Sequence, residues 1–191
     1  MIDFNDRMPA LSRDQMDDAQ RAAADELIAG PRKGVKGPFI SLLRSPQLMA
    51  RLQKVGEYLR FESGLPRRVN EFVTCVVSRE WTQQFEWATH VPLAIAAGTA
   101  PETIEALREG RRPTGMSREE DLAYDFTTEL QRNHGVSEAT YRAAVEALGE
   151  RGVIDLVGLV GYFTSVSMAL NVAHTPPEGG SSVEPLPLLP R

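Results

Sequence analysis

The chain has 191 residues, of which 42% are hydrophobic and 25% are charged, a composition typical of one globular domain. Its formal net charge of −5 argues against general binding to nucleic acids or to anionic membranes. The single cysteine, Cys75, excludes an internal disulfide and a pair of redox cysteines, and its apolar surroundings predict a buried core thiol. No signal-peptide pattern and no run of about 20 apolar residues is present, so we expect a cytoplasmic protein.

Helical periodicity accounts for most of the chain after an extended arm at residues 1–11. Ser12 and Gln15 have the spacing of a capping box, which predicts a first helix over 13–29 that ends at Gly30. Ser45 followed by Pro46 is a favoured helix start. The remaining helices are expected from Pro46 to about 62, from Pro66 to a turn at 78–82, from that turn to 97, and over 99–109, 118–133, 138–148 and 153–173.

The segment GPRKGVKGPF, residues 30–39, concentrates three glycines, two prolines and three cations. It allows two interpretations. It is a plain connector, or Arg32, Lys33 or Lys36 lies over a binding site and attracts an anionic substrate, with Phe39 forming an apolar wall.

The C-terminal part combines an apolar helix with a proline-rich tail. Residues 153–173 are apolar on nearly all sides, which indicates a central buried helix or an oligomer contact. Residues 175–191 contain five prolines and should be extended, and the run PLPLLP is apolar enough to lie on a neighbouring subunit. We therefore predict an all-α fold, with one multi-helix domain over 1–174 followed by an extended tail over 175–191.

The stretch EFVTCVVSREWTQQFEWATH, residues 71–90, places ionisable groups among residues that should form the core. Glu86 and His90 are four residues apart and share one helix face. Glu71 joins them if the chain turns back between Ser78 and Thr82, although no glycine or proline marks that turn. A carboxylate that accepts one imidazole N–H fixes the tautomer and supports the charged ring, as in acid/base sites.

Further candidates surround this group. Arg79 is either the partner of a substrate carboxylate or a surface residue paired with Glu80. Trp87 belongs to an aromatic cluster that packs in the core or forms a pocket wall, and Tyr162 is a weaker candidate for a hydrogen-bond donor. Glu86 and His90 supply only two ligands, so no metal site is expected.

The spacing of Glu71, Gln83, Glu86 and His90 resembles the core pattern of the carboxymuconolactone decarboxylase and alkylhydroperoxidase D superfamily. The peroxidase branch has cysteines at the positions of Gln83 and Glu86, whereas FEWATH followed by AIAAG and PETIEAL is similar to the decarboxylase-like branch. The resemblance covers residues 46–112. It implies a multi-helix bundle of the alkylhydroperoxidase D type, usually assembled as a trimer or a hexamer.

The resemblance also implies an activity: decarboxylation, without a cofactor, of a small carboxylated lactone or a related anionic intermediate of aromatic catabolism. His90 is then expected to donate the proton, with Glu86 as its partner or a second acid/base and Glu71 as the orienting carboxylate. Gln83 and Arg79 are expected to hold the oxyanion and a substrate carboxylate. Two other hypotheses stay open: a non-catalytic oligomeric protein that binds a small ligand, and an isomerase or lactone hydrolase on the same scaffold.

Overall fold

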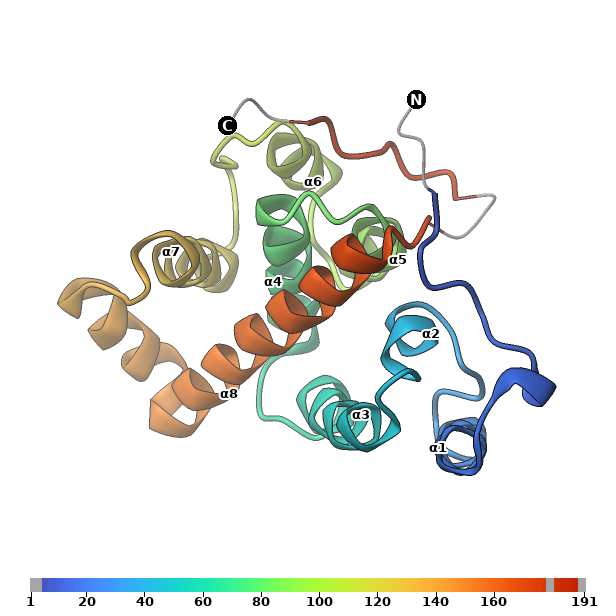
Figure 1. Ribbon diagram of the computed structural model, residues 1–191. Coiled ribbons are helices and arrows are strands. Elements are labelled where there is room, and N and C mark those ends of the chain that lie inside the picture. Colours follow the sequence, from blue (N-terminus) through green and yellow to red (C-terminus); the bar gives the residue numbers. More distant parts are fainter. Residues whose placement is uncertain (1–4, 178–180, 189–191) are drawn as a thin grey trace.

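The computed structural model describes residues 5–177 and 181–188, and over those residues it contains helices and no strand. The predicted all-α single domain is confirmed (Figure 1). Its elements are the 3₁₀ turn η1 (Arg13–Gln15) and the helices α1 (Asp18–Ala29), α2 (Pro38–Leu42), α3 (Pro46–Phe61), α4 (Arg67–Glu80), α5 (Gln84–Ala96), α6 (Pro101–Arg108), α7 (Arg118–Asn133) and α8 (Glu138–Ala173).

The antiparallel pair of α4 and α5 occupies the centre of the fold, with α7 and α8 packed against α4 (Figure 1). The chain turns between these helices where the sequence placed the turn. Thr82 adopts a left-handed conformation with φ of 47°, and Gln83 caps α5 by accepting hydrogen bonds from the backbone N–H groups of Phe85 and Glu86. A side-chain cap thus makes the reversal that a glycine or proline makes in other turns.

Helix α8 crosses the domain diagonally and combines the two helices expected over 138–148 and 153–173. Gly149, with φ of 68°, marks a kink between them. By length and composition α8 could cross a membrane, but 56% of its most apolar stretch is buried inside the fold. Asp155 within this helix accepts a hydrogen bond from the Tyr58 hydroxyl at 2.9 Å, which satisfies one of its oxygens.

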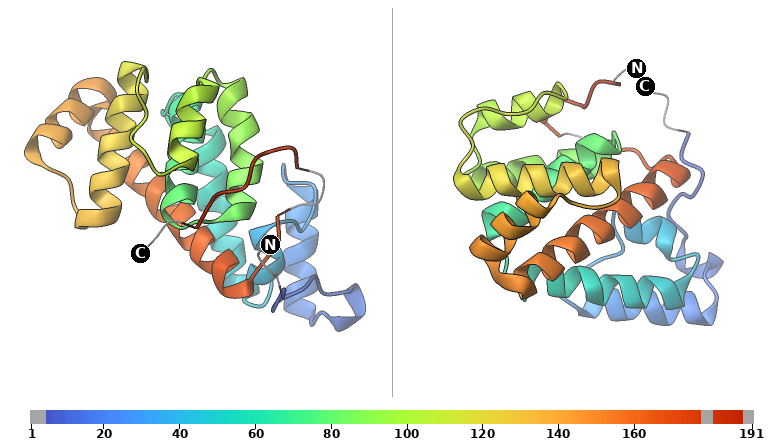
Figure 2. Two further views of the ribbon diagram at one scale, coloured as in Figure 1. Left: turned by 90° about the horizontal axis from the view of Figure 1, so that it is seen from above. Right: turned by 90° about the vertical axis from the view of Figure 1, so that its left-hand side faces the viewer.

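The N-terminal region differs from the prediction. The Ser12 capping box closes only the short turn η1, because the backbone of Met16 is extended and interrupts it. A second capping box, Asp17 with Gln20, starts α1 five residues later than expected. Helix α2 begins within the segment predicted as a loop. Helices α1, α2 and α3 share a small apolar cluster that includes Leu27, and Figure 2 shows α1 and α3 side by side at the end of the domain away from α6.

Residues 181–188 of the tail are extended and lie on helices of the same chain. The side-chain amide of Gln84 pairs with both backbone groups of Leu186, accepting from its N–H at 2.9 Å and donating to its carbonyl at 2.7 Å. The indole N–H of Trp87 donates to the Glu184 carbonyl at 3.0 Å. The tail therefore fastens the start of α5, the helix that carries Glu86 and His90.

Replacing Leu186 with alanine should lower the free energy of unfolding by about 2 kcal/mol, because its side chain is 3% exposed and leaves a cavity against α5. The matched control is Leu188→Ala, since Leu188 is 73% exposed and should change stability by less than about 0.5 kcal/mol. Urea unfolding of both variants checks this. Equal losses would show that the tail is not held as described.

Candidate active site

Glu71 of α4 and His90 of α5 meet across the helical hairpin. Their side chains form a hydrogen bond of 2.7 Å between Glu71 Oε2 and His90 Nδ1, and both residues are almost completely buried. The two positions lie at the same level because they are equally distant from the centre of the turn at Glu80 and Trp81, as the sequence predicted. This hydrogen bond orients the imidazole and places a proton on Nδ1, which donates it to Glu71.

Glu86 occupies the other edge of the same imidazole. Its Oε2 lies 3.3 Å from His90 Nε2, with the i, i+4 spacing of neighbours on one helix face. The ring of Phe163 on α8 meets the imidazole edge-to-face, with 5.1 Å between ring centroids. His90 is therefore held between two carboxylates and against an aromatic ring, which fixes its position on three sides.

The protonation of this group follows from its charges. Burial disfavours an imidazolium, but hydrogen bonds to Glu71 and Glu86 outweigh that effect and raise the pKa of His90 above its ordinary value. Burial also acts to raise the pKa of Glu71, but the hydrogen bond to His90 and the nearby Arg60 and Arg67 lower it overall. Each residue thus favours the charged form of the other: Glu71 favours a protonated imidazole, and His90 favours an ionised carboxylate.

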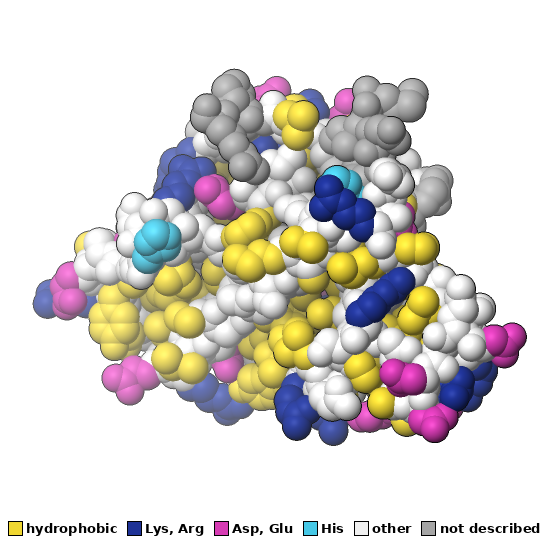
Figure 3. Space-filling model, in the orientation of Figure 1, with side chains coloured by type: hydrophobic (Ala, Val, Ile, Leu, Met, Phe, Trp, Pro, Cys, Tyr) yellow, Lys and Arg dark blue, Asp and Glu magenta, His cyan; other side chains and the backbone are white. Residues whose placement is uncertain are grey.

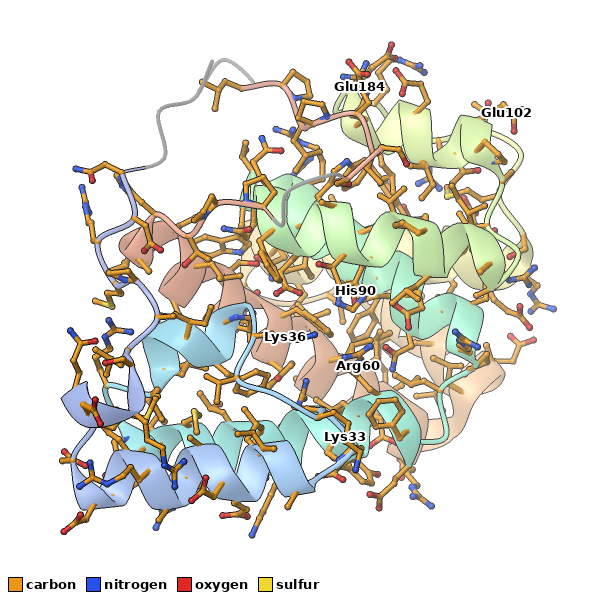
Figure 4. All side chains as sticks on the ribbon, turned by 90° about the vertical axis from the view of Figure 1, so that its right-hand side faces the viewer. Lys33, Lys36, Arg60, His90, Glu102 and Glu184 are labelled. Carbon is orange, nitrogen blue, oxygen red and sulfur yellow. The ribbon has the colours of Figure 1, made fainter. Side chains whose placement is uncertain are left out.

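Glu86 and His90 open onto a cavity of about 370 Å³, whereas Glu71 lies behind the imidazole and does not line it. Three cations line this cavity: Arg32 and Lys36 from the segment before α2, and Arg60 from the end of α3. In Figure 4, Lys36 and Arg60 lie beside His90. The apolar part of the wall comes from Phe39, Phe61, Phe85, Phe163 and Val166. The cavity therefore combines a proton-transfer group with positive charge and an apolar lining.

The segment 30–39 thus contributes to the site and is more than a connector. Gly37 adopts φ of 55°, and a Cβ atom there would lie 2.6 Å from the Phe85 ring, so glycine allows the segment to pack closely on α5. Lys36 and Phe39 line the cavity as the second interpretation expected. Lys33 does not line it, and its Nζ donates to the Ala29 carbonyl at 3.4 Å.

The three residues predicted to bind substrate lie elsewhere. Arg79 donates to the Pro187 carbonyl at 2.9 Å and to Thr82, on the side of the tail. Gln83 caps α5 and donates to Asn171 at 2.9 Å. Trp87 packs under the tail as described above. None of the three lines the cavity that holds Glu86 and His90, because each is committed to a segment far away in sequence.

Other lining residues were missed or undervalued by the sequence. Arg60 and Phe61 end α3 without any local pattern that marks them, and only the packing of α3 beside α8 brings them to the cavity. Thr89, one residue before His90, also lines it, and its hydroxyl donates to the Phe85 carbonyl at 2.9 Å. Tyr162, the weaker candidate, lines the cavity as well.

Metal binding and thiol chemistry find little support in the donor set. Within residues 5–177 and 181–188, no group of three or more His, Cys, Asp or Glu side chains is arranged to hold a metal ion. Glu71 and Glu86 bind opposite edges of the imidazole, so the three side chains do not converge on one point. Cys75 is fully buried, and burial raises the pKa of its thiol well above the ordinary value.

Comparison with known proteins shows what this chain is similar to. The chain has the fold of the crystal structure described as an alkylhydroperoxidase AhpD core, an uncharacterized peroxidase-related protein from Ralstonia eutropha JMP134. The TM-score is 0.72 at 16% sequence identity, and the match covers 91% of this chain and 92% of that chain. Residues 46–129 match the carboxymuconolactone decarboxylase family, which extends the predicted range 46–112 and confirms the resemblance. No curated protein matches the chain.

Stability should depend on pH through His90. Its pKa is raised above 6.5 in the folded protein, so its stabilisation is complete below that value and is lost as the pH rises through the folded pKa. We expect the stability difference between the wild type and His90→Gln to shrink as the pH rises above 6.5. Urea unfolding across this range measures it. A difference that stays constant with pH would contradict a stabilising imidazolium.

Proposed function

We propose that the protein is an acid/base enzyme that acts, without a cofactor, on a small carboxylated lactone or a related anion, with decarboxylation as the preferred reaction. The observation that carries this proposal is the orientation of His90. Its Nδ1 edge is held by Glu71, while its Nε2 edge and Glu86 face a cavity lined by three cations. One edge of the imidazole is thus held by Glu71, and the other, which is paired with Glu86, faces the cavity.

The reaction makes two demands on such a site. When carbon dioxide leaves an unsaturated lactone, the electron pair of the broken C–C bond spreads through the double bond onto the lactone carbonyl. The site must stabilise the resulting oxyanion and then deliver a proton to carbon. Lys36 and Arg60 supply positive charge in the cavity, which supports the first demand. The protonated His90 supports the second.

The residue roles follow from position. His90 delivers the proton from Nε2, where Glu86 is its partner, because the Nδ1–H is engaged in the hydrogen bond to Glu71. Glu71 does not line the cavity and acts as a positioning residue that maintains the imidazolium. Arg79 and Gln83 have no part in this scheme, and the cavity cations replace them as the groups that meet the oxyanion.

A second candidate function has its own support. Glu71, His90 and Glu86 satisfy one another and are almost completely buried, as expected in a binding protein that kept the scaffold without the chemistry. That protein would bind small anions reversibly and leave them unchanged. Product analysis after incubation with an unsaturated γ-lactone carboxylate separates the two functions, because only the enzyme releases carbon dioxide or forms an isomer or an open-chain acid.

The protein is also proposed to be a homo-oligomer, a trimer or a hexamer. Exposed positions recur along one face of α8 at helical spacing, and Ile154, Val157, Met168 and Val172 place large apolar side chains there. Figure 3 shows hydrophobic side chains in the centre of this side of the molecule. Such a stripe has the pattern of a helix that packs against a neighbour.

Substitution of His90 with glutamine should reduce decarboxylation of carboxymuconolactone by about 10²- to 10⁴-fold, the usual contribution of a general acid. Carbon dioxide release measures the rate. His134→Asn is the control, since His134 is exposed at the end of α7 and lies outside the cavity. Undiminished turnover by His90→Gln would end the assignment of the proton donor.

The proposed assembly depends on α8. Light scattering after gel filtration should give a mass of at least three subunits for the wild type. The double variant Ile154→Glu with Met168→Glu should have a lower mass, because charges cannot be buried unpaired between subunits. Ile28→Glu on α1, where Ile28 is also exposed, serves as the control. A monomeric wild type would overturn the proposal.

A further inference from the structure

We infer that Arg32 and Tyr162 form a carboxylate-binding subsite in the cavity of Glu86 and His90. The inference deepens the proposed function and rests on it for the reaction that follows binding. Both residues line the cavity, Arg32 from the segment after α1 and Tyr162 from α8. They are separate from the proton-transfer group and have a different task, which is to recognise the ligand.

The guanidinium of Arg32 has the Tyr162 hydroxyl as a neighbour but no carboxylate partner. Its Nε and Nη2 atoms are buried and have no hydrogen-bond partner among the described residues, and none of their carboxylates forms an ion pair with it. Nε–H and Nη2–H lie on the same edge of the guanidinium and point in parallel. This edge matches the two oxygens of one carboxylate in a bidentate pair. Burying these N–H groups without acceptors is energetically costly, and a bound carboxylate would remove that cost.

The position of Arg32 is fixed by its neighbours. Its guanidinium lies 4.4 Å above the centre of the Phe39 ring. Its Nη2 and the hydroxyl of Tyr162 both lie against Gly56 of α3, where an added Cβ would be 2.9 Å from Nη2 and 2.3 Å from the hydroxyl oxygen. Glycine at position 56 therefore makes room for both groups. The subsite is built by three separate segments and is not a mobile surface charge.

Tyr162 adds a neutral donor. Its side chain is almost completely buried, and burial raises the pKa of the phenol, although the nearby Arg32 opposes this. The hydroxyl thus keeps its proton over the physiological range and can donate it to an oxygen of the ligand. Arg60, whose Nε is also buried without a partner, adds a second positive charge to the same cavity. The ligand class is a small organic acid bound through a carboxylate.

Binding of a matched acid and ester tests the subsite. The probes are 5-oxooxolane-2-carboxylate, a γ-lactone acid, and its methyl ester, which has nearly the same shape without the charge. By calorimetry the wild type should prefer the acid by at least about tenfold, and Arg32→Gln should weaken acid binding by about 10- to 100-fold while ester binding changes little. Lys33→Gln removes a cation from the same segment outside the cavity, so it should keep the wild-type preference.

Stability without ligand provides a second measurement. If the role of Arg32 is to bind a ligand, Arg32→Met should leave the melting temperature of the ligand-free protein unchanged or raise it, because the substitution removes an unpaired buried cation. If Arg32 is a structural residue, the same variant melts at a lower temperature. A lower melting temperature, equal affinity for acid and ester, or no saturable binding of the acid by the wild type would each overturn the subsite.

The outcomes also separate the subsite from the proposed function. His90→Gln should retain the preference for the acid while it loses turnover. A wild type that shows the Arg32-dependent preference without any turnover supports the subsite and contradicts the enzyme. Turnover that depends on His90, with a preference that survives Arg32→Gln, contradicts the subsite alone.

Discussion

The hydrogen bond between Glu71 and His90 is the interaction on which the site depends. Two ionisable side chains are buried between α4 and α5, and the charged form of each would be strongly destabilising without the other. Their 2.7 Å contact requires the two helices to run antiparallel in one register. The left-handed Thr82, the Gln83 cap and the Gln84 contacts to the tail all act near the turn that sets this register. The surrounding structure therefore serves to hold one imidazole.

The charges of the site come from two separate parts of the chain. Glu86 and the Glu71–His90 pair belong to α4 and α5, while Arg32, Lys36 and Arg60 come from the part of the chain that precedes α4. An anion attracted by these cations enters the cavity that Glu86 and His90 also line. The apolar rings in the lining reduce screening by water and strengthen the electrostatic interactions there. Recognition and proton transfer are thus carried by different segments of one domain.

The sequence predicted the parts that follow from local spacing. The i, i+4 relation of Glu86 to His90 and the symmetry of Glu71 and His90 about residues 78–82 were sufficient to place the three together. Helical periodicity, with start signals such as Ser45 followed by Pro46, placed most helices. The sequence did not predict contacts between segments that are far apart along the chain. Arg79 and Trp87 donate hydrogen bonds to backbone carbonyls of the tail, and Gln83 donates one to Asn171 of α8. Arg60 reaches the cavity only through tertiary packing, so no local pattern could identify it. Capping boxes at Ser12 and at Asp17 both precede the first long helix, and helical periodicity did not show which of them starts it.

The most direct test is the protonation state of His90, followed by ¹⁵N NMR of the imidazole nitrogens as a function of pH. We predict an imidazolium, with both nitrogens mainly protonated at pH 6.5, because the two carboxylates raise the pKa of His90 beyond that value. A neutral imidazole with one protonated nitrogen at pH 6.5 would contradict it. His90 could then not serve as the proton donor, and the cavity would have to be explained as a binding site alone.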